Sequence, residues 1–138
     1  MLKVLILCTG NSCRSQMAEA WVRHFNPKIK VYSGGTHPEP VNKYAVRVMN
    51  EKGIDISKYR SNNVKEYVDV DFDFILTVCD KAKQICPNFH SASALKIHHS
   101  FTDPANAKGS ESKKLVIYRD VRDQLKKYII DFLRDYCS

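Results

Sequence analysis

The sequence contains little glycine or proline, five residues of each in a chain of 138. Apolar residues make up 43% and charged residues 27% of the chain. This composition is ordinary for a globular domain and excludes collagen-like, low-complexity and disordered chains. With roughly 150 residues per domain as a guide, the length predicts one domain spanning the whole chain.

Long hydrophobic runs are also absent. The longest, such as 4–8, fall far short of the roughly 18 residues that indicate a membrane-spanning helix. Gly10, Asn11 and Arg14 interrupt the first apolar segment, so it does not resemble a secretory leader. We therefore expect a cytoplasmic protein without membrane contact. In that reducing compartment, five cysteines favour catalytic, metal-binding or buried thiols over structural disulfides.

Positively charged residues outnumber negatively charged ones, which gives a formal net charge of +7 and a pI of about 9.2. Such a balance favours an anionic ligand or simply a soluble surface. The basic residues are spread evenly along the chain, and the sequence has neither a basic arm nor an interleaved aromatic and basic RNA-binding motif. We therefore expect no nucleic-acid partner.

Short β-favouring segments alternate with helical ones along the chain. Strands are predicted at 2–7, 30–33, 72–78 and 94–99, and helices at 15–25, at 42–51 and along a C-terminal face formed by Ile117, Val121, Leu125, Tyr128 and Phe132. This order predicts an α/β fold, a single-domain open parallel sheet of about four strands with helices on both faces. Ligands bind beyond the carboxyl ends of such strands, where Cys8, Cys79 and Asp103 would converge.

The segment from Cys8 to Ser15 joins the first strand to the first helix and carries a cysteine and an arginine six positions apart. The backbone N–H groups of the intervening residues can wrap a tetrahedral oxyanion, and Arg14 can clamp it with two hydrogen bonds. The predicted oxyanion-binding residues are Thr9, Gly10, Asn11, Ser12, Cys13 and Arg14. Gly10 and Asn11 tolerate the positive φ that such a loop can require.

The positive field of that loop stabilises a thiolate, so we expect Cys8 to be an ionised nucleophile near neutral pH, with Ser15 hydrogen-bonded to its sulfur. The alternative is an inert buried cysteine before an ordinary helix. No GK[ST] or GxGxxG pattern is present, which excludes Walker A and dinucleotide-binding loops. Four residues separate Cys8 from Cys13, and six separate Cys79 from Cys86, which disfavours zinc.

The string CTGNSCRSQMAE resembles the phosphate loop of low-molecular-weight protein tyrosine phosphatases and, more closely, that of the thioredoxin-coupled arsenate reductases built on the same fold. The similarity continues through VYSGG, GIDIS, TVCDKAKQICP, FTDPA and RDVRDQL and so spans nearly the whole chain. The second cysteine pair, Cys79 and Cys86, is the most discriminating part, since a phosphatase has no use for two further thiols.

The resemblance implies a relay of three thiols. Cys8 attacks arsenate, Cys79 attacks Cys8 and expels arsenite, and Cys86 then forms a disulfide with Cys79. Asp103 matches the general acid of the family. No bound cofactor is implied; reduced thioredoxin would be the electron donor, although a glutaredoxin and glutathione system would meet the same disulfide. The protein is expected to be a monomer that detoxifies arsenic.

Helix geometry adds a constraint on the last step of this relay. Residues seven apart on an ideal helix are about 10 Å apart, whereas the Cα atoms of a disulfide lie within about 7 Å. If the segment from Cys79 to Cys86 is helical, we expect it to unwind when the disulfide forms.

Two departures from the resemblance limit what it implies. Asn11, Glu19 and Ser33 match positions that hold potassium in some of these reductases, but Asn62 stands where an aspartate is expected, so we predict metal-free catalysis. Ala105 follows Asp103-Pro104 where tyrosine phosphatases carry an aromatic residue, which counts against a phosphotyrosine substrate.

Two other functions remain open at this level. A low-molecular-weight phosphatase would hydrolyse phosphate esters without Cys79 and Cys86. A non-enzymatic sensor would be oxidised only stoichiometrically. Cys13 is expected to be structural and Cys137 incidental, and the histidines are expected to be hydrogen-bonded or solvated.

Overall fold

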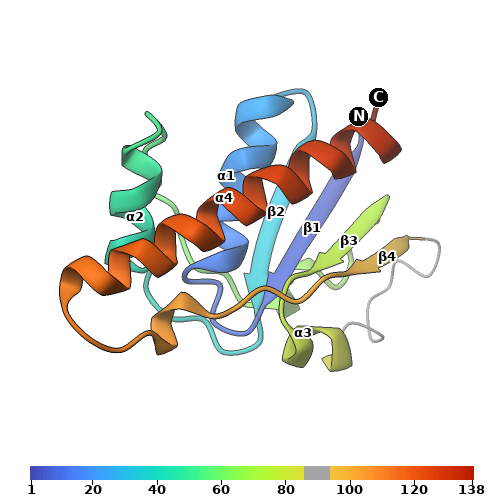
Figure 1. Cartoon of the computed structure of the whole chain (residues 1–138). Helices are drawn as coiled ribbons and strands as arrows, with labels where there is room; N and C mark the ends of the chain where they lie inside the picture. The colour runs from blue at the N-terminus through green and yellow to red at the C-terminus, as the bar shows by residue number, and fades with distance from the viewer. Residues whose placement is uncertain (86–93) are drawn as a thin grey trace.

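The computed structural model describes residues 1–85 and 94–138, which form helices packed on a parallel sheet (Figure 1). The elements follow in chain order as β1 (Lys3–Cys8), α1 (Arg14–Phe25), β2 (Lys30–Gly35), α2 (Lys43–Asn50), the 3-10 helix η1 (Val64–Tyr67), β3 (Phe74–Thr77), α3 (Asp80–Ile85), β4 (Leu95–His98), the 3-10 helix η3 (Pro104–Asn106) and α4 (Glu111–Tyr136). The predicted alternation of strands and helices is confirmed.

Strand β1 lies inside the sheet, which has the order β2-β1-β3-β4 with every neighbouring pair parallel. Leu5 of β1 pairs with Tyr32 on one side and with Ile75 on the other. All residues from Val4 to Cys8 are buried, which explains why this strand is a continuous apolar run. Because the strands are parallel, β1 and β3 end at the same edge of the sheet, where Cys8 is the last residue of β1 and Cys79 comes two residues after β3.

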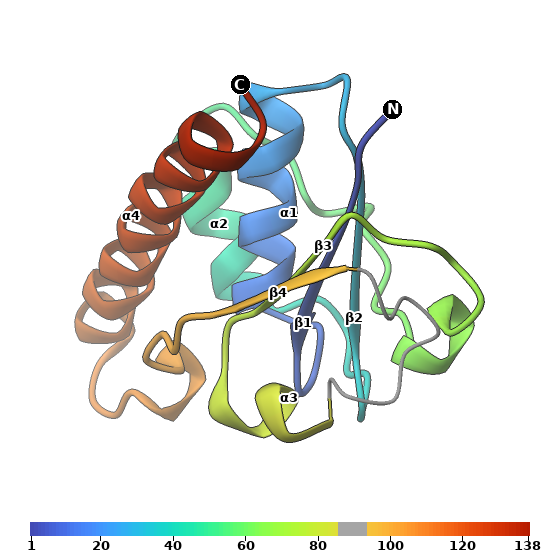
Figure 2. The ribbon, with the colours of Figure 1, turned by 90° about the vertical axis from the view of Figure 1, so that its right-hand side faces the viewer.

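The long helices α1, α2 and α4 cover one face of the sheet (Figure 2). The other face is covered by η1 and the segment after it, where the rings of Tyr32, Tyr67 and Phe72 meet edge to face. The predicted helical layers on both faces are therefore present but unequal in size. Among the described residues, no helix is both long and apolar enough to cross a membrane.

The C-terminal helix is confirmed, and Val121, Leu125 and Phe132 of its predicted apolar face are buried, but the other two residues of that face are not fully buried. Ile117, expected in the core, is 37% exposed, and Tyr128 is only partly buried. The face that packs on the molecule carries Leu115, Tyr118, Val121, Arg122, Leu125, Ile129, Phe132 and Leu133. The charged Arg122 lies within this stripe and hides its helical period from an analysis of apolar residues alone.

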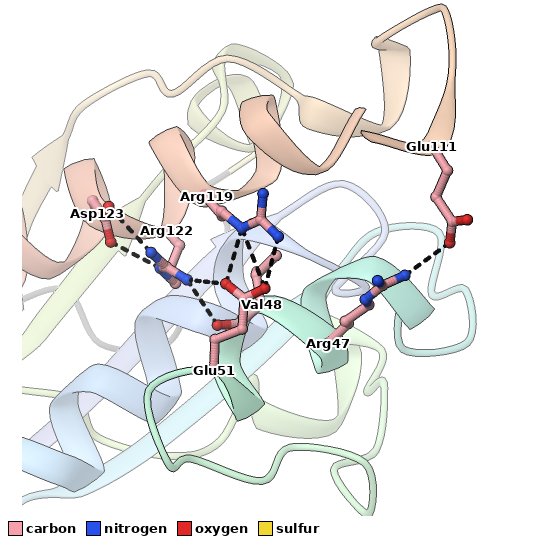
Figure 3. Close-up of polar contacts among 7 residues, drawn as sticks. All are labelled: Arg47, Val48, Glu51, Glu111, Arg119, Arg122 and Asp123. Carbon is pink, nitrogen blue, oxygen red and sulfur yellow. Dashed lines mark hydrogen bonds and ion pairs between the residues drawn. The ribbon is translucent and has the colours of Figure 1, made fainter. Parts of the chain in front are cut away.

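Arg122 is buried because an ion network joins α4 to the end of α2 (Figure 3). Glu51 accepts hydrogen bonds from Arg119 Nη2 and from Arg122 Nη1, both at 2.9 Å. The Arg122 guanidinium also donates to the carbonyl of Val48 at 2.9 Å and pairs with Asp123 at 2.8 Å. The hydrogen bonds from Arg119 and, next, from Arg122 lower the pKa of Glu51 to about 2.

We predict that Glu51→Gln lowers the free energy of unfolding at neutral pH by about 1 kcal/mol, since part of the network is exposed to solvent. The native pKa of Glu51 lies below its ordinary value of 4.5. Its contribution is therefore complete above that value and is lost as the pH falls toward 2. Urea unfolding at neutral pH and at about pH 3 measures this, because the difference from the parent protein shrinks in acid.

The matched control is Glu111→Gln, which removes the pair formed by Arg47 and Glu111 at 2.9 Å. Both side chains of that pair are more than half exposed, 56% and 61%. We expect a smaller loss of stability for this variant. Equal losses in the two variants, or a Glu51→Gln effect that persists in acid, would contradict the account of the network.

Candidate functional site

The backbone carbonyls of the loop between β1 and α1 accept hydrogen bonds from residues outside the loop. The carbonyls of Thr9, Gly10 and Ser12 accept hydrogen bonds of 3.0, 2.9 and 2.8 Å from the N–H groups of His37, Glu39 and Asn42, respectively. The carbonyl of Asn11 accepts from Gln16 Nε2 and Ser61 Oγ, both at 2.8 Å. In a trans peptide the N–H points away from the carbonyl, so the N–H groups of this loop are directed inward. The loop is therefore preorganised as a cradle for an oxyanion.

Two residues make the tight curvature of the loop possible. Asn11 adopts φ 47°, in the left-handed region, as expected for one of the two permissive residues. Gly10 does not adopt a positive φ, so the loop uses this conformation at Asn11 and not at Gly10. A position that the sequence analysis missed is Gly35, where a Cβ atom would lie 2.4 Å from the carbonyl oxygen of Thr9 and 2.9 Å from the nitrogen of Asn11. The glycine pair in VYSGG was the available signal.

The sulfur of Cys8 is the end of a chain of buried hydrogen bonds. The side-chain nitrogen of Asn11, Nδ2, donates to Ser15 Oγ at 2.8 Å and to Ser33 Oγ at 2.9 Å. Ser33 in turn donates to Glu19 Oε1 at 2.7 Å. Since Ser15 Oγ already accepts from Asn11, its own hydrogen is left for Cys8 Sγ, which lies 2.9 Å away. The backbone N–H of Asn11 donates to the same sulfur at 3.2 Å, so two donors can stabilise a negative charge on it.

The positions that match a potassium site, Asn11, Glu19 and Ser33, are engaged by hydrogen-bond donors within the protein. Arg23 Nε lies 2.9 Å from Glu19 Oε2, so a guanidinium neutralises that carboxylate. Asn62 directs its Nδ2 at the carbonyl of Ser33, at 3.3 Å, where a cation would need an oxygen. Ser33 Oγ is already engaged on both sides by Asn11 and Glu19. These residues do not fit a bound potassium ion.

Arg14, the first residue of α1, is held by the loop that follows β4. Its Nη1 donates to the carbonyl of Phe101 at 3.0 Å, and its Nη2 lies 3.5 Å from Asp103 Oδ2. Asp103 also caps η3 by accepting from the N–H of Ala105. The predicted general acid and the predicted oxyanion clamp are thus brought together, each with its side chain partly buried.

Cys79 lies in the same cleft as Cys8. The cleft has a volume of about 400 Å³, and it is lined by Cys8, Thr9, Gly10, Ser12, Cys13 and Arg14 from the loop and by Cys79, Ser100 and Asp103 among others. Thr9 Oγ1 lies 3.4 Å from Cys79 Sγ, which connects the second thiol to the residue next to the first. Cys86, the third predicted thiol, lies outside the described residues.

Two other cysteines and His98 have environments different from that of Cys8. Burial raises the pKa of Cys13 well above its ordinary value, and negative charge on Cys8 raises it further, so this thiol stays protonated at neutral pH. Cys137 lies at the far end of α4 and does not line the cleft. His98 is hydrogen-bonded to Thr77 Oγ1 at 2.7 Å and to Asp80 Oδ1 at 3.0 Å, so it is engaged within the fold.

We predict that Gly35→Ala weakens binding of inorganic phosphate about tenfold, because the new methyl group displaces the backbone of the loop. Titration calorimetry measures the affinity. Gly34→Ala is the matched control, since its Cβ would meet only a side-chain atom of Tyr67 at 3.3 Å and the backbone of Val64 at 3.4 Å. Unchanged affinity in Gly35→Ala would show that the loop is not held rigidly by this contact.

We also predict that Ser15→Ala slows iodoacetamide modification of Cys8 about tenfold at neutral pH, because a hydrogen bond to a charged group is lost. Peptide mass spectrometry follows the modification of each cysteine. Ser100→Ala is the control, since Ser100 lines the same cleft without a hydrogen bond to Cys8. If both variants react at the parent rate, Ser15 does not act on the sulfur.

Comparison with known proteins agrees with this geometry. A model of the low molecular weight phosphotyrosine protein phosphatase family matches residues 3–136. The arsenate reductase of Halalkalibacterium halodurans is 40% identical over 130 residues, which cover 94% of this chain and 93% of that protein. Solved structures of an arsenate reductase in the phosphate binding state and of one in the oxidized state have TM-scores of 0.82 and 0.83 at 29% and 28% identity, each covering 97% of this chain and 98% of the other. The chain belongs to the low molecular weight phosphotyrosine protein phosphatase family.

Proposed function

We propose that this protein reduces arsenate to arsenite, using Cys8 as the nucleophile and Cys79 and Cys86 as the reducing thiols. The observation that carries this proposal is that Cys79 shares the oxyanion cleft with Cys8. Hydrolysis of a phosphate ester needs one thiol in such a cleft. Reduction of a bound oxyanion needs a second thiol that forms a disulfide with the first. Relatives named arsenate reductase support the same assignment.

In the first step the inward N–H groups of the loop and Arg14 bind the arsenate oxygens. The thiolate of Cys8 then attacks arsenic, forming an S–As bond, and one arsenic–oxygen bond breaks. Asp103, which lies beside Arg14, supplies the proton that lets this oxygen leave as water. Arsenic is still pentavalent at this point, so no electrons have been exchanged.

Reduction occurs in the second step. The Cys79 thiolate attacks the sulfur of Cys8, a disulfide forms between them, and the S–As electron pair stays on arsenic, which leaves as arsenite. Two electrons have passed from the two sulfurs to arsenic. Thr9 Oγ1 contacts Cys79 Sγ at 3.4 Å and supports this thiol beside the loop.

The third step releases Cys8. The thiolate of Cys86 attacks Cys79, a disulfide forms between these two residues, and the electron pair of the broken bond returns to Cys8. An external dithiol must then reduce the new disulfide. We propose thioredoxin for this role, in the cytoplasm, with a glutaredoxin and glutathione system as the alternative donor, and we propose that the protein acts as a monomer.

Weak phosphatase activity is a second function that the site favours. Arsenate and phosphate are both tetrahedral oxyanions, and the loop, Arg14 and Asp103 are the groups that ester hydrolysis requires. The lining of the cleft carries charged and small residues, including Glu39, Asp80, Lys81 and Ala105, and among the described residues it has no Phe, Tyr or Trp side chain. We therefore expect slow hydrolysis of small phosphate esters and no preference for phosphotyrosine.

We predict sustained NADPH oxidation when the protein is mixed with arsenate, thioredoxin and thioredoxin reductase. Cys8→Ser, Cys79→Ser and Cys86→Ser should each lower turnover by at least about a hundredfold, because each step needs its own thiol. Cys137→Ser should keep the parent rate, since Cys137 lies outside the cleft. Hydrolysis of p-nitrophenyl phosphate, run in parallel, should be lost in Cys8→Ser alone.

Two outcomes would contradict the proposal. Brisk ester hydrolysis with no arsenate turnover, with either thioredoxin or glutaredoxin, would make the protein a phosphatase. Stoichiometric oxidation of the thiols without turnover would make it a sensor.

A further inference from the structure

A second groove, of about 570 Å³, lies along β2, the edge strand of the sheet. One wall is formed by the turn and strand from Pro27 to Ser33, and the other by the segment around Lys58 to Arg60. Tyr67 of η1 also lines it. This groove is separate from the cleft that holds Cys8, although Glu19 and Ser33 at its side belong to the hydrogen-bond chain that ends on the Cys8 sulfur.

The groove is strongly basic. Its lining includes five cationic side chains, Arg23, Lys28, Lys30, Lys58 and Arg60, and a single carboxylate, Glu19. Arg23 already neutralises Glu19 at 2.9 Å. Among the described residues, no carboxylate forms a direct ion pair with any of the four other cations. The groove therefore concentrates positive charge, which Glu19 and the Asp55 carboxylate near Lys58 offset only in part.

Aromatic rings accompany these charges. Tyr32, Tyr59 and Tyr67 line the groove, and the rings of Tyr32 and Tyr67 meet at 5.2 Å. Burial raises the pKa of Tyr67 to about 12, so its phenol stays neutral and can donate a hydrogen bond. Cations beside neutral tyrosines are suited to phosphate groups and to a planar ring carried next to them.

The wall that contributes Arg60 is fixed rather than free. The carbonyl of Arg60 accepts hydrogen bonds from Gln16 Nε2 at 2.9 Å and from Asn62 Nδ2 at 3.1 Å. Gln16 also holds the carbonyl of Asn11 in the catalytic loop. Lysines on an edge strand can serve only to prevent strand pairing, which would account for Lys30. That purpose does not account for Lys58 and Arg60, which come from a different segment and converge on the same groove.

We propose that this groove binds a polyphosphate group, carried either by a nucleotide or by an inorganic polyphosphate. Lys58 and Arg60 on one wall and Lys28 and Lys30 on the other would contact the phosphate oxygens, and the tyrosines would contact the base if a nucleotide is the ligand. Binding does not depend on the arsenate chemistry.

The test is a titration of the isotopically labelled protein with ATP, tripolyphosphate and adenosine, followed through backbone amide signals. Binding in the groove moves the signals of residues 29–33 and 58–60, whereas occupation of the catalytic loop moves those of residues 9–14. We expect ATP and tripolyphosphate to move the first set and adenosine alone to leave it unchanged. Tighter binding of ATP than of tripolyphosphate identifies a nucleotide, and equal affinity identifies an inorganic polyphosphate; both support the proposal.

The variant Lys58→Gln/Arg60→Gln should weaken the groove titration about tenfold, as expected for the loss of two exposed charge contacts. The control Lys113→Gln/Lys127→Gln removes the same charge from exposed positions of α4 and should leave the titration unchanged. Arsenate turnover without added ligand should be the same in all three proteins, so failure here is separable from failure of the reductase assignment.

Three outcomes would overturn the proposal. The first is movement of the loop signals alone. The second is equal weakening in the two double variants, which would show attraction to net charge rather than to this groove. The third is binding of adenosine as tight as that of ATP, which would show that phosphate is not recognised.

Discussion

The loop from Cys8 to Ser15 depends on one buried asparagine whose polar groups are all engaged. The Asn11 carbonyl is held by Gln16 and Ser61, its side-chain oxygen accepts from the N–H of Asn62, its side-chain nitrogen donates to Ser15 and Ser33, and its N–H points at the Cys8 sulfur. The residue is completely buried and adopts a left-handed conformation. These hydrogen bonds offset the cost of its left-handed φ. Without them, the buried polar groups of Asn11 would have no partners in the interior. Because the Asn11 side-chain nitrogen donates to both Ser15 and Ser33, it sets the donor direction in the series of hydrogen bonds that links Glu19 to Cys8.

Two ion pairs neutralise charged side chains on opposite sides of that loop. Behind it, Arg23 neutralises Glu19, so the carboxylate that orients Ser33 does not add a free negative charge near the Cys8 sulfur. In front of it, Arg14 is held by Asp103 and by the carbonyl of Phe101, so the clamp is oriented before an oxyanion arrives. A cradle whose donors are already aligned loses little energy in reorganisation when a tetrahedral anion binds.

Sequence reasoning located the parts of the site that come from contiguous segments. The alternation of apolar strands with helices placed Cys8, Cys79 and Asp103 at one edge of the sheet, and the spacing from Cys8 to Arg14 predicted the loop. It could not identify the supports that come from distant segments, such as Gly35 under the loop or the N–H groups of His37 and Glu39 on its carbonyls, because backbone contacts leave little trace in side-chain patterns. The burial of Arg122 in α4 was not predicted, because it depends on Glu51, which lies 71 positions away in the chain.

The central claim is that the Cys79 thiolate attacks the sulfur of Cys8 and displaces arsenic as arsenite. The most direct measurement is to add one equivalent of arsenate to the reduced Cys86→Ser variant, quench with acid, and map disulfides by mass spectrometry without reductant. The account predicts a disulfide between Cys8 and Cys79 and release of one arsenite per protein. Unchanged arsenate together with free Cys8 and Cys79 thiols would contradict it.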